Sequence, residues 1–427
     1  MRHAFTVVFL AVAFAQAQTC SQGQPTSLGT VTQLGIACNA GTLPQTTCTR
    51  LQVDCPGISS IEVRLRVTDP APGLTRRGTV VLGTGGGGTL FYGERTGGPE
   101  LITALASRGF RCIDRAWTRG WFDDPVSVRK QSCRYATLLQ WIHQNLHGAG
   151  VFCATGTSGG SAELGYALTT WSSADILDTA VLTGGPPMSR LDKICGLDPS
   201  WNGNCQQHIQ PGVFECGTPG CTLQPNHQVC IACSPLATAT DLEADSILFP
   251  GATLSFPDTR VHVMRGGADC SNAVPAGLLF YHAVTSHRVL EIAKATPHWT
   301  SETVEGRASV LRAVLGTIAC PGAAATLNAP TWPQLGGSLQ VEVQGPASGN
   351  WLLALALTPD LVNVPGLGFL FLGPPSVIVG LGGLDPAGLG SFSMPVPATP
   401  SLTGLELFGQ ALTGSCLTNL LRVVVLP

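Results

Sequence analysis

The segment Gly156–Gly160 holds the residues best suited to chemistry. It reads Gly-Thr-Ser-Gly-Gly, a G-x-S-x-G pattern with Ser158 at its centre. A serine in a tight turn between a strand and a helix can act as a nucleophile, because small neighbours let the backbone bend sharply and push the hydroxyl outward. Glycine supplies 52 of the 427 residues, so the pattern alone could arise by chance. The interpretation therefore depends on partners elsewhere in the chain.

A nucleophilic serine needs a histidine to take its proton and a carboxylate to orient that histidine. Both groups follow Ser158 along the chain, each after an apolar, strand-like run. Asp269 follows the run 260–265, and His298 follows the run 288–293. The order serine, acid, histidine on loops after successive strands predicts Ser158, Asp269 and His298 as a catalytic triad.

Each partner also has an ordinary structural interpretation. Asp269 could cap the helix predicted after it, and His298 could be a surface loop residue. Asp245 and Asp258 are weaker acids for the role because they precede the strand instead of following it. The other histidines after the leader fall in predicted helices or at their ends, inside a strand, or in a cysteine-rich segment. They are His143, His147, His208, His227, His262, His282 and His287.

A glycine-rich loop, Gly83–Gly88, directly follows the strand-like run Thr79–Leu82. Backbone N–H groups in such a loop can hold the negative charge that develops on a carbonyl oxygen under attack. We predict an oxyanion hole made by Gly159 together with Gly85, Gly86 and Gly87. The loop also matches the G-x-G-x-x-G dinucleotide pattern, but that pattern should open a helix directly. Residues 89–93 intervene, and Asp114 comes late for the expected acid.

The elements around these residues alternate between strands and helices. The run 151–154 predicts a strand before Ser158, and 162–171 predicts a helix after it. Further helices are predicted over 273–283 and 305–318. This alternation predicts an α/β fold with a mostly parallel central sheet flanked by helices.

Residues 60 to 320 resemble the α/β-hydrolase superfamily, specifically its secreted bacterial serine esterase and lipase branch. The resemblance rests on the Gly83–Gly88 loop, the Gly156–Gly160 turn, Asp269 and His298, in that order. It implies ester hydrolysis through an acyl-enzyme, with no cofactor and no metal. The chain lacks the histidine that often precedes the oxyanion glycines in lipases, which leaves the second oxyanion donor open.

Aromatic residues lie close to the predicted machinery. If exposed, Phe91, Tyr92 and Trp299 would form a substrate pocket for apolar or aromatic acyl groups, although such residues are as often packing. Trp117, Trp121 and Phe122 raise the same question. A cysteine-rich insertion over about 186–250 would either cap the site or form a disulfide-stapled surface excursion.

The first 17 residues predict a secretory signal peptide. Arg2 and His3 precede an apolar run that ends in Ala15-Gln16-Ala17, an A-x-A cleavage pattern. The mature chain should be secreted or periplasmic. Charged residues make up 11% of the chain against roughly 25% in an average protein, and the net charge is −3. Without a basic run, neither nucleic acid nor an acidic membrane surface is an expected partner.

Sixteen cysteines, all after the predicted cleavage site, fit an oxidising compartment and an even set of disulfides. Six of them lie between Cys195 and Cys233. A zinc cluster there is conceivable because Cys230 and Cys233 have a C-x-x-C spacing, but disulfides suit an exported chain better.

The composition changes near Cys320. From Pro321 to the end there are five charged residues, and short apolar runs alternate with Gly/Pro turns. This pattern predicts a small all-β, sandwich-like module over 326–427, after a hydrolase domain over 18–325. The module resembles β-rich carboxy-terminal modules of secreted bacterial proteins and could bind a surface.

The sequence therefore predicts a secreted serine esterase acting on a small-molecule or polymeric ester. Three alternatives stay open: a polyester depolymerase that works on solid polymer, a secreted serine peptidase, and a non-catalytic adhesion or binding protein with a degenerate hydrolase domain.

Overall fold

A computed structural model describes residues 27–124, 126–193, 239–269, 271, 273–318, 325–330, 332–364, 368–414 and 416–427. The predicted signal peptide and the cysteines of the insertion therefore lie outside the described residues. Among the described helices, none combines the length and the apolar composition that a bilayer crossing requires.

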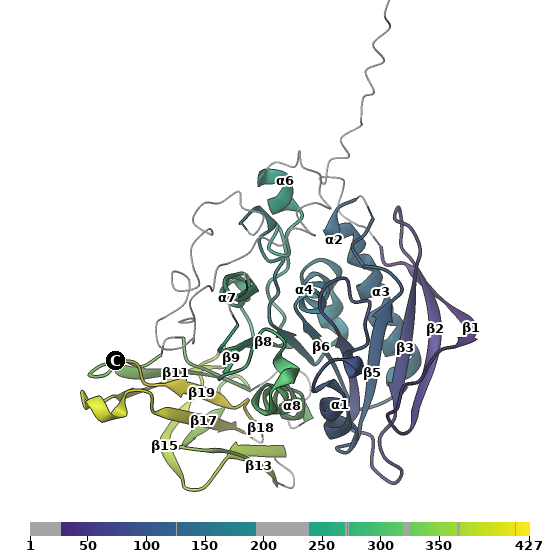
Figure 1. Ribbon diagram of the computed structural model, residues 1–427. Coiled ribbons are helices and arrows are strands. Elements are labelled where there is room, and N and C mark those ends of the chain that lie inside the picture. Colours follow the sequence, from purple (N-terminus) through teal and green to yellow (C-terminus); the bar gives the residue numbers. More distant parts are fainter. Residues whose placement is uncertain are drawn as a thin grey trace, which may run out of the picture.

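A nine-stranded sheet forms the centre of the larger part of the chain (Figure 1). Its strands are β1 (Thr30–Ala37), β2 (Thr46–Asp54), β3 (Ile61–Thr68), β4 (Gly78–Gly83), β5 (Phe110–Trp117), β6 (Val151–Thr157), β7 (Thr179–Thr183), β8 (Arg260–Gly266) and β9 (Arg288–Ala293). The spatial order is β1-β2-β3-β5-β4-β6-β7-β8-β9. Strands β4 to β9 run parallel, and β1, β2 and β3 extend one edge as antiparallel neighbours. The predicted parallel α/β sheet is confirmed.

The helices cover both faces of this sheet. They are α1 (Gly98–Ala106), α2 (Val128–Gln131), α3 (Cys133–Ile142), α4 (Gly159–Trp171), α6 (Ala239–Ala244), α7 (Ala273–Ala283) and α8 (Val304–Ile318), with short 3₁₀ turns η1 (Tyr92–Glu94) and η7 (Thr300–Glu302). Alternate residues of a strand point to opposite faces. Val81 accordingly packs with α3, α4 and α7, whereas Val80 and Leu82 pack with α1 and α8. Both faces are buried, as a parallel sheet requires.

The C-terminal residues form separate antiparallel sheets, with the strands β10 (Thr326–Asn328), β11 (Ser338–Gln344), β12 (Asn350–Ala356), β13 (Pro359–Val364), β14 (Gly368–Leu372), β15 (Ser376–Gly383), β16 (Leu389–Pro395), β17 (Glu406–Thr413), β18 (Cys416–Leu417) and β19 (Leu421–Val424). One sheet has the order β10-β11-β16. A second has the order β15-β12-β17-β18, with β19 also on β17, and β13 pairs with β14.

This C-terminal module, predicted over 326–427, has its own apolar core and also shares one with α8. Leu339, Val341 and Leu353 are buried inside the module. Phe371 is instead buried in one cluster with Val310 and Val314 of α8. The module lies beside β9 and α8 in Figure 1. The exact domain boundary stays a prediction.

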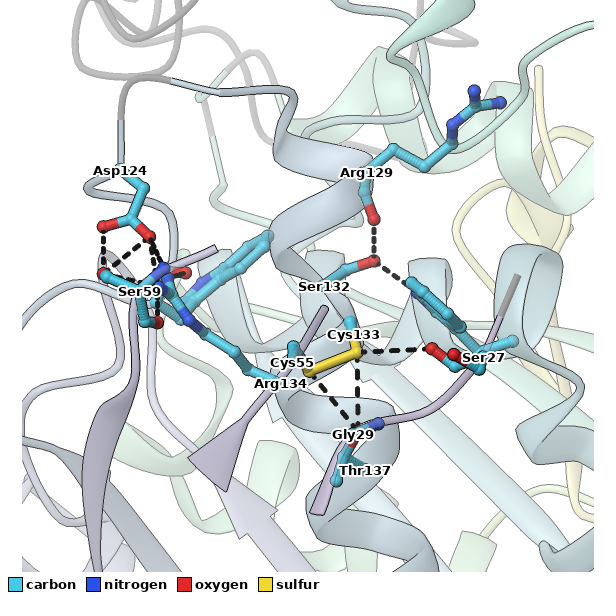
Figure 2. Close-up of a disulfide and its surroundings, with 12 residues drawn as sticks. Ser27, Gly29, Cys55, Ser59, Asp124, Arg129, Ser132, Cys133, Arg134 and Thr137 are labelled. Carbon is cyan, nitrogen blue, oxygen red and sulfur yellow. Dashed lines mark hydrogen bonds and ion pairs between the residues drawn. A yellow bond between two sulfur atoms is a disulfide. The ribbon is translucent and has the colours of Figure 1, made fainter. Parts of the chain in front are cut away.

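Two disulfides tie the antiparallel edge of the sheet together. Cys38–Cys48 links β1 to β2, and Cys55–Cys133 links the end of β2 to the start of α3 (Figure 2). Cys416 is also in a disulfide. These findings agree with the expected oxidising compartment.

The expectation that all sixteen cysteines pair is wrong for Cys112 and Cys153, which are free and buried. They lie on β5 and β6, and both are in register with Val80 on β4, which runs between those strands. Strands are about 4.8 Å apart, so the two Cα atoms are separated by about 10 Å, beyond the roughly 7 Å that a disulfide can span. Burial raises the pKa of both thiols, which keeps them protonated and unreactive.

Candidate active site

Ser158 lies at the sharp turn between β6 and α4, as predicted. Its backbone has φ 54° and ψ −115°, in the left-handed half of conformational space that non-glycine residues rarely occupy. The Ser158 N–H donates to Thr183 O on β7 at 2.9 Å, which fixes the turn to the neighbouring strand. A Cβ on Gly156 would lie 2.3 Å from Gly160 O, so the turn needs glycine at that position. The sequence pattern therefore reflects a real steric requirement.

Asp269 and His298 meet at the same end of the sheet. Asp269 follows β8 and is 1% exposed, and its Oδ2 lies 2.8 Å from His298 Nδ1. Both hydrogen bonds of the His298 ring within the described residues are at Nδ1, since Ser271 Oγ lies 3.1 Å from the same atom. This arrangement assigns the Nδ1 proton to the carboxylate side and leaves Nε2 as the atom that can exchange a proton with a hydroxyl.

The Asp269 carboxyl is held in its charged form. Burial raises its pKa, but the hydrogen bond and charge of His298 and the bonds from Ser271 lower it by more, so the pKa lies below the ordinary value. The Ser271 N–H donates to Asp269 Oδ1 at 2.9 Å. The carboxylate is thus ionised at neutral pH and can orient the imidazole and stabilise its protonated form.

The end of β7 brings the histidine loop next to the serine turn. Thr157 and Thr183 are in register on β6 and β7. The next residue, Gly184, has φ 53°, and a Cβ there would lie 2.7 Å from His298 O and 3.2 Å from the ring atom Cε1. The residue directly after Thr183, which accepts the Ser158 N–H at the end of β7, therefore lies against the imidazole.

The glycine loop after β4 packs directly on the turn. A Cβ on Gly85 would lie 3.0 Å from Ser158 Cβ, and a Cβ on Gly159 would lie 2.0 Å from Gly86 O. The Gly88 N–H donates to Gly85 O at 3.1 Å, so this amide serves the loop's own turn and not an oxyanion. Gly87 is fixed by the Trp121 N–H, which donates to Gly87 O at 3.1 Å. Gly85, Gly86 and Gly87 stay the candidate donors beside Gly159.

The carboxylate that a dinucleotide site in this loop would need, Asp114, is engaged in hydrogen bonds within the protein. Asp114 is 3% exposed on β5, and it accepts the N–H groups of Tyr92 at 2.6 Å and Gly93 at 2.8 Å. Its carboxylate thus holds the segment that leaves the loop.

The aromatic residues near the site do not meet the condition of exposure. Phe91, Tyr92 and Trp299 are 2%, 0% and 7% exposed. The Tyr92 and Trp299 rings are 5.6 Å apart, and the Arg66 guanidinium stacks over Phe91 at 3.9 Å. Trp117, Trp121 and Phe122 are buried as well. In the structure these rings are part of the packed interior and do not line an exposed substrate pocket.

Three residues in contact with the machinery have no signal in the sequence. Ser271 follows Asp269 by two residues and touches both members of the acid–histidine pair. Arg115 and Glu163 form a buried ion pair beneath the glycine loop. The spacing Ser158 to Glu163 is unremarkable in a helix, and only the sheet order brings Arg115 to it.

Comparisons with known proteins give no match to a protein-family model or to a curated protein. Among solved structures, the chain is similar to Est1E from Butyrivibrio proteoclasticus, with 14% identity and a TM-score of 0.39, over 62% of this chain and 98% of that one. It is also similar to a Pyrobaculum calidifontis esterase, with 15% identity, a TM-score of 0.39, and coverage of 60% and 80%. A third is brefeldin A esterase, a bacterial homologue of human hormone sensitive lipase, with 16% identity, a TM-score of 0.42, and coverage of 66% and 80%.

The assignment of the fold rests on the structure itself. The structure has the arrangement that the sequence resemblance implied. The parallel strands have the order β5-β4-β6-β7-β8-β9, and the strained serine follows β6, the acid follows β8 and the histidine follows β9. The larger part of the chain has an α/β-hydrolase fold.

Proposed function

We propose that this protein is an exported serine hydrolase that cleaves carboxylic esters. The observation that carries the proposal is the strained Ser158 turn, packed against the Gly85–Gly86 backbone, with a hydrogen-bonded Asp269–His298 pair at the adjoining strand ends. A backbone held in this conformation by its neighbours is typical of a functional site.

In the proposed mechanism, Ser158 Oγ attacks the ester carbonyl carbon while its proton passes to His298 Nε2. The carbonyl oxygen becomes an oxyanion, which accepts hydrogen bonds from the N–H of Gly159 and from the Gly85–Gly87 loop. The C–O bond then breaks, and the leaving alcohol takes the proton from His298. Water activated by the same histidine hydrolyses the acyl-enzyme and restores the Ser158 hydroxyl. Asp269 stays ionised throughout.

Covalent labelling tests this proposal. A fluorophosphonate probe should modify the wild-type protein and fail to modify Ser158→Ala, while Ser161→Ala, three residues along α4, should still be labelled. Equal labelling of the Ser158 variant would refute the nucleophile. Initial rates on p-nitrophenyl esters of increasing chain length, beside a peptide substrate, then separate esterase from peptidase activity.

A second candidate, hydrolysis of solid polyester, is favoured by one surface of the module. Leu381, Leu352 and Leu412 are in register across β15, β12 and β17, so they share one face of the sheet. Leu381 is 73% exposed and Ile378 is 60% exposed. An aliphatic sheet face suits contact with an apolar solid. Release of soluble products from a polyester film, measured beside p-nitrophenyl butyrate hydrolysis, tests this activity.

Export is supported by the disulfides at the sheet edge, because such bonds persist in oxidising compartments. Sequencing the amino terminus of the protein recovered from the medium should show a chain that begins near Gln18.

A further inference from the structure

A buried ion pair lies directly beneath the glycine loop. Arg115 on β5 and Glu163 on α4 both have fully buried side chains, and the Arg115 Nη2 group contacts Glu163 Oε2. Trp117 Nε1 donates to Glu163 Oε1 at 2.6 Å, so both carboxylate oxygens are engaged. Neither charged side chain lies at the reacting atoms proposed above.

The guanidinium supports both ends of the loop. Arg115 Nη1 donates to Gly88 O at 3.2 Å. A Cβ on Gly83 would lie 2.6 Å from Arg115 Nη2, and a Cβ on Gly88 would lie 2.2 Å from Nη1. The loop thus begins and ends against one rigid, planar group, and the absence of side chains at these glycines permits this approach.

The carboxylate belongs to the helix that starts at the serine turn. Glu163 follows Ser158 by five residues in α4, whose first residue, Gly159, supplies one proposed oxyanion donor. The ion pair therefore connects the two backbone segments whose N–H groups must converge on one oxygen. Such donors act only when they are held close to the productive geometry, within about 0.5 Å.

The energetics favour a positioning role over a stabilising one. Removing two charges from water costs several kcal/mol, and apolar residues of similar volume often replace a buried ion pair at no loss of stability. Burial lowers the pKa of Arg115 to about 10, which still leaves it charged at neutral pH. Arginine suits the position because its fork reaches a carbonyl and a carboxylate at once, whereas lysine offers a single point charge.

We propose that the Arg115–Glu163 ion pair is the positioning device of the oxyanion hole, which fixes the Gly85–Gly87 loop relative to the start of α4. This inference rests on the proposed esterase function, and it names two residues that set the rate without touching the substrate.

The test compares Glu163→Gln with one control variant, Glu291→Gln, and with a double variant that removes both charges. Glu291→Gln breaks another partly buried pair, Arg312–Glu291 at 3.0 Å, which joins α8 to β9 away from the loop. The double variant Arg115→Met/Glu163→Leu replaces the pair by apolar side chains and guards against a folding defect. Each protein is assayed for kcat and KM on p-nitrophenyl butyrate, for melting temperature, and for amide hydrogen exchange of the peptide that spans residues 83–93.

Glu163→Gln and the double variant should lose about 10- to 100-fold in kcat with KM within about twofold, because a displacement of about 1 Å near the reacting atoms has an effect of this size. Their 83–93 amides should exchange faster, and the double variant should melt near the wild-type temperature. Glu291→Gln should keep the wild-type kcat and loop exchange.

Wild-type kcat and loop exchange in the double variant would overturn the proposal, as would unchanged loop exchange in Glu163→Gln. If the loop exchanges faster in both variants but wild-type protein has no esterase activity and no fluorophosphonate labelling, the positioning role stands and the proposed function fails.

Discussion

The interior of the domain built on the nine-stranded sheet and the interior of the C-terminal module contain different kinds of buried residue. The first contains buried ionisable side chains, and the fully or nearly fully buried acidic and arginine residues are Asp114, Arg115, Arg134, Glu163, Asp245, Arg260, Arg265 and Asp269. In the described part of the module, the buried polar residues are all uncharged, such as Gln410, Thr418 and Asn419. A buried charge is costly unless it is paired, so its presence indicates that something is held in place.

The objects held in place are loops at the carboxyl edge of the sheet. Asp114 holds the segment at Tyr92, Arg115 holds the glycine loop, and Asp269 holds His298. Arg134, which lies beside the Cys55–Cys133 bond in Figure 2, donates to Trp121 O. The Trp121 N–H in turn donates to Gly87 O. In the described part of the module, no buried charged residue holds a loop, and its sheets pack through apolar side chains. Substitutions in the first region should therefore change rate, and substitutions in the second should change stability.

The largest expected effect comes from Asp269→Asn, which removes the charge that orients His298. We expect kcat on p-nitrophenyl butyrate to fall about 10³- to 10⁴-fold, because replacing the aspartate of a serine protease triad by asparagine has an effect of this size. The control is Asp385→Asn, which alters a carboxylate that accepts backbone N–H groups in a turn of the module. A comparable loss of kcat in the control would contradict the expectation that only substitutions in the sheet domain change the rate.

Phe371→Ala should give the next largest effect, on stability. Phe371 is fully buried against α8, and truncation of a buried Phe typically costs about 3–5 kcal/mol. Urea unfolding should show a lower midpoint, while kcat of the folded fraction stays at the wild-type value. Leu389→Ala, at a position 46% exposed, serves as control and should leave the midpoint unchanged. A loss of kcat without a change of midpoint would contradict the expectation that substitutions in the module change stability and not rate.

A smaller, pH-dependent effect is expected where the two regions meet through charges. Glu406 of β17 pairs with Lys294 and Arg422, each at 3.0 Å. Burial raises the Glu406 pKa, but the bonds and charges of Lys294 and Arg422 lower it further, so the folded pKa lies below the ordinary value. The carboxylate thus stabilises the folded state above the unfolded pKa of about 4.3 and loses this contribution as the pH falls through the folded value.

Glu406→Gln should therefore reduce the free energy of unfolding by about 1 kcal/mol or less at neutral pH. The difference from wild type should shrink as the pH is lowered below about 4, as measured by urea unfolding over a pH series. Glu342→Gln, at an exposed position on β11, should show neither effect. A deficit that persists in acid would mean that the charge of Glu406 is not its source.

The smallest effect on the fold is expected for Leu381→Ser, since surface substitutions usually change stability by less than about 0.5 kcal/mol. The rate on soluble p-nitrophenyl butyrate should be unchanged. Adsorption to a polyester film, measured by depletion from solution, should fall. Ser376→Ala on the same strand is the matched control. Undiminished adsorption of the Leu381 variant would remove the module face from the polyester proposal.

Much of the fold was predictable because its signals are local. The helix over 273–283 and the strand over 288–293 have the predicted bounds, since each is an apolar run ended by turn residues. The meeting of Asp269 with His298 was also predictable, because parallel strands bring their carboxyl ends to one edge. The unpaired thiols of Cys112 and Cys153 and the Arg115–Glu163 pair were not predictable. They depend on which strands are neighbours, and that order is set by contacts between residues distant in the sequence.

The position of β4 between β5 and β6 has a consequence for how the chain must be assembled. If β5 and β6 met first, Cys112 and Cys153 would lie on adjacent strands, about 4.8 Å apart and within range of a disulfide. That bond would prevent β4 from pairing between β5 and β6, and the glycine loop that follows β4 would then not reach the Ser158 turn. In an oxidising compartment, a chain in which β4 already lies between β5 and β6 cannot form this bond, because the two Cα atoms are then about 10 Å apart.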